Sequence, residues 1–266
     1  MQSVDTLRCA KRDSMRDFLL FQHKNLEGVY EYLVSTIDNT VGRKTIRANP
    51  LLECDIRCCY TREVMRKSPS EEGVLKISHG DWRRVFGRNK SDYVAIYLPL
   101  DGKIYLQEDM WCLCNFVHET LHSRSVLSKK NGPYPNLRFV YEGITELLTG
   151  WILQSEFKEC FGSWSTIEMC FLKPYLRWVK LWNYFSWKVG IKRIIDVYFD
   201  CSLTDPLEAL VKLAIKKQYK IKNVFSPYDA NTDLESRFTD ELSEVFGHDF
   251  DEYSASDIRL LEPGKI

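Results

Sequence analysis

The residues of this sequence with the clearest chemical potential are His-Glu-Thr-Leu-His at positions 118–122. On an α-helix, two histidines four positions apart lie one turn apart and within roughly 40° of each other, so His118 and His122 could bind one metal ion. Glu119 points to the neighbouring side of that face, where a carboxylate could take a proton from a water on the metal. The pattern arises by chance in roughly 0.7% of chains of this length and composition. The alternative is a surface helix with two solvated histidines.

Two further carboxylates, Glu142 and Glu146, stand four positions apart and would share one helix face. Zinc held by two histidines needs a third protein ligand and an open position, and a glutamate supplies that ligand. Glu142 follows His122 by 142 − 122 = 20 residues, enough for an antiparallel helix to return past the metal. Glu146 could then accept the spare N–H of His118 and fix its tautomer. Glu146 could also bind the metal itself, but Glu142 is preferred because it leaves Glu146 this second role. We therefore predict a zinc (Zn2+) site.

The sequence also predicts the elements that position these residues. β-Branched and aromatic residues around an Asp-Gly turn predict a β-hairpin over residues 93–107. A segment without Pro or Gly predicts a helix over residues 110–125, and after a break at 131–135 a second helix is expected over about 140–157. Helical spacing also recurs in three other stretches. They are an N-terminal stretch over residues 5–37, which Glu27 and Gly28 could interrupt, an aromatic-rich stretch over 162–198 and an acidic stretch over 234–246.

The motif at 118–122, followed by Tyr141-Glu142-Gly143-Ile144-Thr145-Glu146, resembles the active-site helix and glutamate helix of gluzincins, the thermolysin-like zinc metallopeptidases. The resemblance covers residues 93–157. It implies zinc held by His118, His122 and Glu142, Glu119 as general base, Glu146 behind the first histidine, and hydrolysis of peptide bonds. It also implies that the edge strand of the hairpin lines the substrate cleft. The chain departs from the family at Tyr141, where Asn is usual, and at Glu146, where thermolysin has Asp.

Such enzymes also use a tyrosine or histidine to stabilise the oxyanion of the reaction. Three residues could take this role here: Tyr134, Tyr175 and His248. Tyr175 ranks first, because the donor must come from the part of the chain that faces the zinc. The ordinary alternative for each is a place in a core or interface, where tyrosine is common.

The resemblance and the element pattern together predict an α+β protein with a zincin-like core, in which a small mixed sheet lies beside the active-site and glutamate helices. Three parts are expected: an N-terminal helical segment (residues 1–50), a zincin catalytic core (51–160) and a helical C-terminal subdomain (161–266). The expected partner is a peptide or protein substrate.

Composition excludes several partners. Lys plus Arg and Asp plus Glu both total 37, so no net charge would attract nucleic acid or an anionic membrane. The basic, aromatic stretch at 82–90 is better explained as a solvated face. The first twenty residues are interrupted by charges and no apolar run could span a bilayer, so a cytoplasmic protein without a membrane segment is expected.

The nine cysteines indicate buried thiols rather than a disulfide scaffold, because the count is odd and the chain is long. Two are on the predicted histidine helix, Cys112 and Cys114, and are expected to be core residues. Two weaker hypotheses remain. Cys54, Cys58 and Cys59 could contribute to a structural zinc site. Cys9, in the N-terminal segment, could bind the catalytic zinc through its thiolate and so inhibit the enzyme.

Two other functions stay open at the level of the sequence. One is a zincin-fold binding or regulatory protein that keeps the zinc without turnover. The other is a helical interaction module in which the motif is fortuitous. Metal content distinguishes the helical interaction module, which would bind no zinc, from the two zinc proteins. Cleavage of peptides distinguishes the peptidase from the zinc-holding binding protein.

Overall fold

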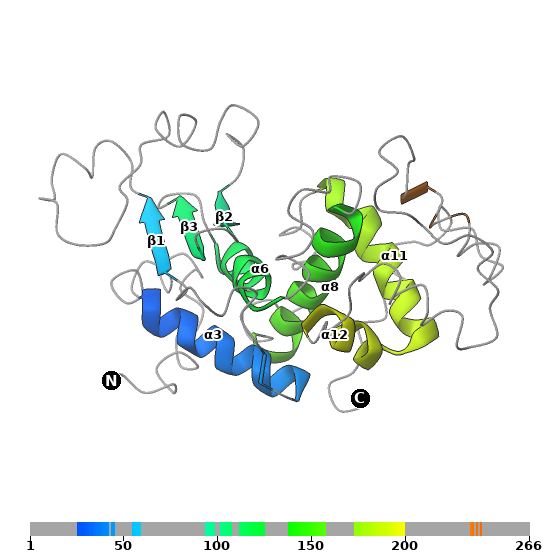
Figure 1. The fold of residues 1–266 in the computed structure, drawn as a ribbon, viewed down its shortest axis with the longest axis horizontal. Coiled ribbons are helices and arrows are strands. Elements are labelled where there is room, and N and C mark those ends of the chain that lie inside the picture. The colour runs from blue at the N-terminus through cyan, green and yellow to red at the C-terminus, as the bar shows by residue number, and fades with distance from the viewer. Residues whose placement is uncertain are drawn as a thin grey trace, which may run out of the picture.

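The protein is α+β, with long helices packed beside one small sheet (Figure 1). The structure is a computed structural model that describes residues 26–42, 44–45, 55–59, 94–98, 102–107, 112–125, 138–157, 173–199, 235–236, 238 and 240. Its elements in chain order are α3 (Leu26–Val41), β1 (Asp55–Cys59), β2 (Ala95–Leu98), β3 (Lys103–Gln107), α6 (Leu113–Arg124), α8 (Arg138–Glu156), α11 (Lys173–Val189) and α12 (Ile191–Phe199).

The sheet has three strands in the order β1-β3-β2 and is mixed. β2 and β3 form the predicted antiparallel hairpin, with Leu98 opposite Lys103. Gly102 closes the turn, since its N–H donates to the carbonyl of Leu98 at 2.9 Å and its φ of 65° suits glycine. β1 pairs in parallel with the other side of β3. β2 is therefore an edge strand of the described sheet.

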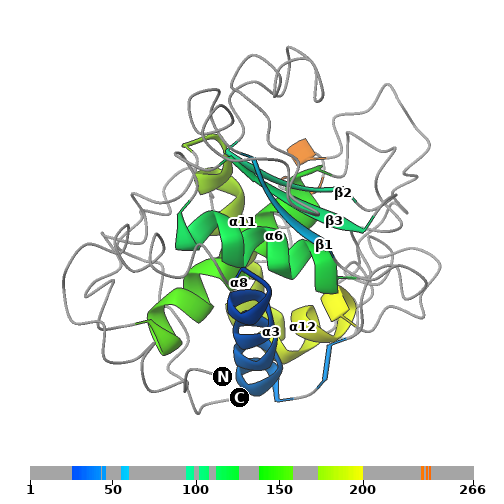
Figure 2. The ribbon, with the colours of Figure 1, turned by 90° about the vertical axis from the view of Figure 1, so that its left-hand side faces the viewer.

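Helix α6 lies between the sheet and α8 (Figures 1 and 2). It carries the histidine motif and packs against β2 and β3 on one side and against α8 on the other. Nearly every residue of α6 is buried, which explains why its sequence shows little amphipathic pattern. The first two residues of the predicted helix, 110 and 111, lie outside the described residues.

Helices α3, α11 and α12 complete the core around α6 and α8. α3 packs on both, and the Tyr30 hydroxyl lies 3.1 Å from Ser123 Oγ on α6. Glu27 and Gly28 do not interrupt α3, because both lie in its first turn. On the other side, α11 packs along α8 through aromatic rings, with Trp182 stacked on Phe139. Phe185 meets Trp182 edge-on, and Phe238 from the predicted acidic helix lies tilted against both of these α11 rings.

Gly143 sets the close approach of α8 and α11. A Cβ at this position would lie 2.5 Å from Trp182 Cδ1 and 2.8 Å from Trp178 Cβ. Gly143→Ala should therefore destabilise the protein by about 1–3 kcal/mol through overpacking, even though alanine favours a helix by about 1 kcal/mol. Urea unfolding measures the change. Ser35→Ala on the exposed side of α3 is the control, expected within about 0.5 kcal/mol of wild type.

None of the helices in the described part of the chain is long and apolar enough to cross a lipid bilayer. The predicted divisions at residues 50 and 160 remain predictions. α3, from the first of the three predicted parts, packs directly on α6 and α8 of the second.

Candidate metal centre

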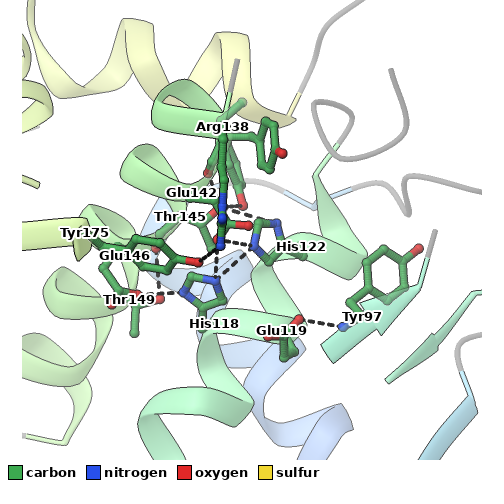
Figure 3. Close-up of polar contacts among 12 residues, drawn as sticks. Tyr97, His118, Glu119, His122, Arg138, Glu142, Thr145, Glu146, Thr149 and Tyr175 are labelled. Atoms are coloured by element: carbon green, nitrogen blue, oxygen red, sulfur yellow. Dashed lines mark hydrogen bonds and ion pairs between the residues drawn. The ribbon is translucent and has the colours of Figure 1, made fainter. Parts of the chain in front are cut away.

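Three side chains from α6 and α8 meet at one point, and their metal-binding atoms all lie within 4.8 Å of one another (Figure 3). His118 Nε2 is 2.9 Å from His122 Nε2. One oxygen of Glu142 lies 3.2 Å from the first of these nitrogens and 3.4 Å from the second. His118 and His122 are only 8% and 7% exposed. The cluster could hold a metal ion.

Glu146 fixes the orientation of His118. The carboxylate of Glu146 lies 2.6 Å from His118 Nδ1, and both side chains are buried. Because a carboxylate accepts, Nδ1 carries the proton in this bond and the Nε2 lone pair of the neutral ring faces Glu142 and His122. This is the arrangement predicted for Glu146, and it fits a supporting role rather than a ligand role.

Thr145 acts on His122 in a comparable way. The Thr145 hydroxyl donates to the backbone carbonyl of Tyr141 at 2.5 Å, which uses its only proton. Its oxygen can therefore only accept, both from His122 Nδ1 at 3.5 Å and from the Tyr198 hydroxyl at 2.6 Å. Tyr198 is fully buried on α12, so it holds the threonine in place from behind. The Nε2 lone pair of His122 is thereby also directed at the cluster.

Two nitrogen lone pairs and a carboxylate thus converge, and such an arrangement requires a positive charge between them. Without a metal, a proton must supply it. Burial lowers the pKa of His118, but the negative charges of Glu146 and Glu142 outweigh burial and hold that pKa well above its usual value. Burial raises the pKa of Glu142, yet His122 and His118 together bring it well below its usual range. A divalent cation would replace the proton and meet the same three atoms.

Glu119 lies on the sheet side of the cluster. The backbone N–H of Tyr97, on edge strand β2, donates to Glu119 Oε2 at 2.6 Å. Glu119 is 9% exposed, and burial raises the pKa of its carboxyl. A carboxylate with a raised pKa is a better proton acceptor near neutral pH, as a general base requires.

Tyr175, from α11, covers the opposite side of the cluster. Its ring is nearly parallel to the His118 imidazole, with a centroid separation of 6.3 Å and an angle of 13°. Arg138, at the start of α8, donates from Nη2 to the Tyr175 hydroxyl at 2.7 Å. Of the three candidate oxyanion donors, Tyr175 is thus beside the cluster, whereas Tyr134 and His248 lie outside the described residues.

No family model, curated protein or solved structure matches this chain. What the site does is therefore inferred from its own residues. The structure brings three of the predicted site residues together, His118, His122 and Glu142. Glu146 bonds to His118, and Glu119 accepts from the backbone of strand β2. Their chemical roles remain predictions.

The cysteines take no part in the described cluster. Cys114 is a buried core residue at 3% exposure, as predicted, and Cys112 is the half-buried N-cap of α6. Cys58 and Cys59 belong to β1 through their backbone. Cys9 and Cys54 lie outside the described residues, so the two weaker cysteine hypotheses stay untested.

Sequence reasoning missed three side chains of the site. Thr145 could have been found, because it stands three positions after Glu142 and therefore on nearly the same helix face. Arg138 stands four positions before Glu142 and carried the same signal. No local sequence signal pointed to Tyr198, because it is 198 − 145 = 53 residues from Thr145, the residue that it contacts.

Proposed function

We propose that this chain is a zinc-dependent peptidase of the gluzincin kind. The observation that carries the proposal is the convergence of two imidazole lone pairs and a carboxylate, with a general-base candidate beside them on the same helix. Two histidines and one glutamate form a known donor set of catalytic zinc sites, which leave one position open. The small sheet with its edge strand beside α6 supports a zincin-like core.

The residues divide the work of peptide hydrolysis. Zinc, when bound by His118, His122 and Glu142, would polarise the scissile carbonyl and make water more acidic. Glu119 would take a proton from the attacking water as its oxygen bonds to the carbonyl carbon. Glu119 would then pass that proton to the amine nitrogen as the C–N bond breaks. Tyr175 would donate a hydrogen bond from its hydroxyl to the oxyanion and keep its proton, since Arg138 can only donate to the tyrosine oxygen and so leaves the O–H directed elsewhere.

Metal analysis followed by a cleavage assay tests this function. The purified chain should contain about one zinc, which is lost in His118→Ala and His122→Ala. The zinc-loaded chain should cleave members of a pooled peptide library, with new termini read by mass spectrometry. Protein without metal after zinc-replete expression would overturn the proposal. Zinc without any cleavage would instead favour a zincin-fold binding protein.

Thr145→Val should weaken zinc binding by about 10–100-fold, the usual effect of losing a group that orients a metal ligand. The valine keeps the shape of the side chain but cannot accept from His122 Nδ1. Competition with a chromophoric chelator measures the affinity. Thr145→Ser should bind zinc as wild type does. Thr149→Val is the matched control, because the Thr149 hydroxyl bonds to a backbone carbonyl of the same helix; an equal loss in that variant would contradict the role of Thr145.

A further inference from the structure

Two cysteines stand at the start of α6, the helix that carries both histidines of the metal cluster. Cys112 is the N-cap of this helix, and both Cys112 and Cys114 are thiols rather than parts of a disulfide. Side chains two positions apart inside a helix point to opposite sides, but the Cys112 backbone is still extended, with φ −132° and ψ 172°. The Cys112 side chain therefore turns over the first turn of α6, where it forms a hydrogen bond with the Cys114 thiol.

These surroundings activate the Cys112 thiol. The hydrogen bond with Cys114 is the largest influence, and the backbone N–H groups of Asn115 and Cys114 also donate to the sulfur. Together they outweigh burial and the negative charge of Glu146, and they lower the pKa of the Cys112 thiol to about 7. About half of this thiol is then thiolate at neutral pH, which is the form that reacts with oxidants. Cys112 is only half-buried, whereas Cys114 is 3% exposed, so Cys112 is the one that a small oxidant can reach.

A thiolate with a second thiol beside it can be oxidised by hydrogen peroxide in two steps. The Cys112 sulfur first attacks one peroxide oxygen, so that an S–O bond forms, the O–O bond breaks, and hydroxide leaves and takes up a proton. The Cys114 sulfur then attacks the Cys112 sulfur, so that the S–S bond forms and the S–O bond breaks. The departing oxygen takes the Cys114 proton and leaves as water. Two electrons pass from the two cysteines to one peroxide.

Oxidation would change the start of α6. The Asn115 side-chain oxygen accepts both the Cys112 N–H at 3.2 Å and the Cys112 thiol proton at 3.0 Å. A disulfide has no such proton, and it would draw the Cys114 side chain away from its place in the core. Cys114 stands one helical turn before His118, which Glu146 holds at 2.6 Å. A shift in the first turn of α6 would therefore disturb the first metal ligand.

We propose that Cys112 and Cys114 form a redox-active dithiol, which hydrogen peroxide converts to a disulfide, and that this disulfide weakens metal binding by α6. The proposal rests on the metal-binding part of the proposed function and not on peptide hydrolysis. Zinc binding without any cleavage would leave it standing. The oxidation itself needs neither zinc nor substrate, so it is measured separately.

Peptide mapping tests the oxidation. Trypsin cuts after Lys103 and Arg124 and releases residues 104–124 as one peptide, which contains Cys112 and Cys114 and no other cysteine. The folded, reduced chain is treated with hydrogen peroxide, and the remaining thiols are blocked with iodoacetamide before digestion. Most of this peptide should then be lighter by two hydrogen atoms and carry no alkyl group. A peptide that is alkylated at both cysteines, or one that is joined to another peptide, would overturn the inference.

Chelator competition tests the effect on the metal. The oxidised chain should bind zinc about 3–30-fold more weakly than the reduced chain, the effect of losing a helix N-cap, and dithiothreitol should restore the affinity. An unchanged affinity in the disulfide form would overturn the control of metal binding. A reduced chain that binds no zinc would overturn it together with the proposed function.

Two variants separate this pair from the other cysteines. Cys112→Ser keeps a side chain that is favoured at an N-cap, so it should bind zinc as the reduced wild type does and lose its sensitivity to peroxide. An equal loss of affinity in peroxide-treated Cys112→Ser would place the sensitive thiol elsewhere and overturn the inference. Cys114→Ala removes the second thiol, so Cys112 should accumulate as a sulfenic acid that dimedone captures at residue 112. Absence of that adduct would exclude Cys112 as the thiol that peroxide attacks.

Discussion

Replacing Glu119 with Gln should slow peptide cleavage by about 10²–10⁴-fold, the contribution usual for a general base, while zinc stays bound. The amide has the shape of the carboxylate and can still accept the Tyr97 N–H that lies 2.6 Å from Oε2. It cannot take a proton from water. The substitution therefore removes the chemical step and leaves the arrangement of α6 against the sheet in place.

The acid side of the pH profile should report the same residue. Burial raises the pKa of the Glu119 carboxyl, and the reaction needs the ionised form. Cleavage by the wild type should therefore fall as the pH decreases through this raised pKa, and it should recover on return to neutral pH. A zinc ion nearby lowers the pKa of this carboxyl, so it reduces the increase that burial causes.

Initial rates on a single cleaved peptide, together with zinc content, check the prediction for Glu119→Gln. Thr120→Ser on the same turn is the control, since the Thr120 hydroxyl donates to the Phe116 carbonyl inside α6 and serine keeps that bond. Activity near the wild-type level in Glu119→Gln would exclude Glu119 as the base. Loss of zinc from that variant would show that Glu119 is a ligand instead.

The candidate ligand set was predictable because local spacing determines most of it. Four residues of helix bring His118 and His122 together whatever the rest of the fold does, and the same holds for Glu142 and Glu146. Bringing the two pairs to one point depends on the packing of α6 against α8, which the loop length allowed but did not require. The hairpin was likewise encoded locally, by its β-branched strands and its Asp-Gly turn.

The support around the ligands could not be predicted in this way, because it comes from tertiary contacts. Tyr198 reaches the site from α12, and Tyr97 contributes a backbone N–H that has no sequence signature. The resemblance to gluzincins is incomplete at Tyr141, where Asn is usual in that family. The Tyr141 ring contacts the His122 ring edge-on, and the backbone carbonyl of residue 141 accepts a hydrogen bond from the Thr145 hydroxyl, which leaves the threonine oxygen as the acceptor for His122.

Glu142→Gln and Glu146→Gln should differ in zinc affinity, and that difference decides which carboxylate is the ligand. Structural zinc sites bind with about 10–16 kcal/mol, so one of three or four ligands contributes about 3–5 kcal/mol, or about 10²–10⁴-fold. Glu142→Gln should lose this much, because the Glu142 oxygen lies within 3.4 Å of both histidine nitrogens. Glu146→Gln should lose about 10–100-fold, the effect of a supporting group.

The smaller effect at Glu146 follows from its place behind the first histidine. Its oxygen lies 2.6 Å from His118 Nδ1, on the side of the ring that faces away from the cluster, and a Gln oxygen can still accept that N–H. Chelator competition gives both affinities, and the visible spectrum of the Co²⁺-substituted protein shows whether the ligand set has changed. Only Glu142→Gln should alter that spectrum, because only there is a ligand atom replaced. The reverse order of affinities, with the spectral change in Glu146→Gln, would make Glu146 the ligand and leave Glu142 as the group that supports the histidines.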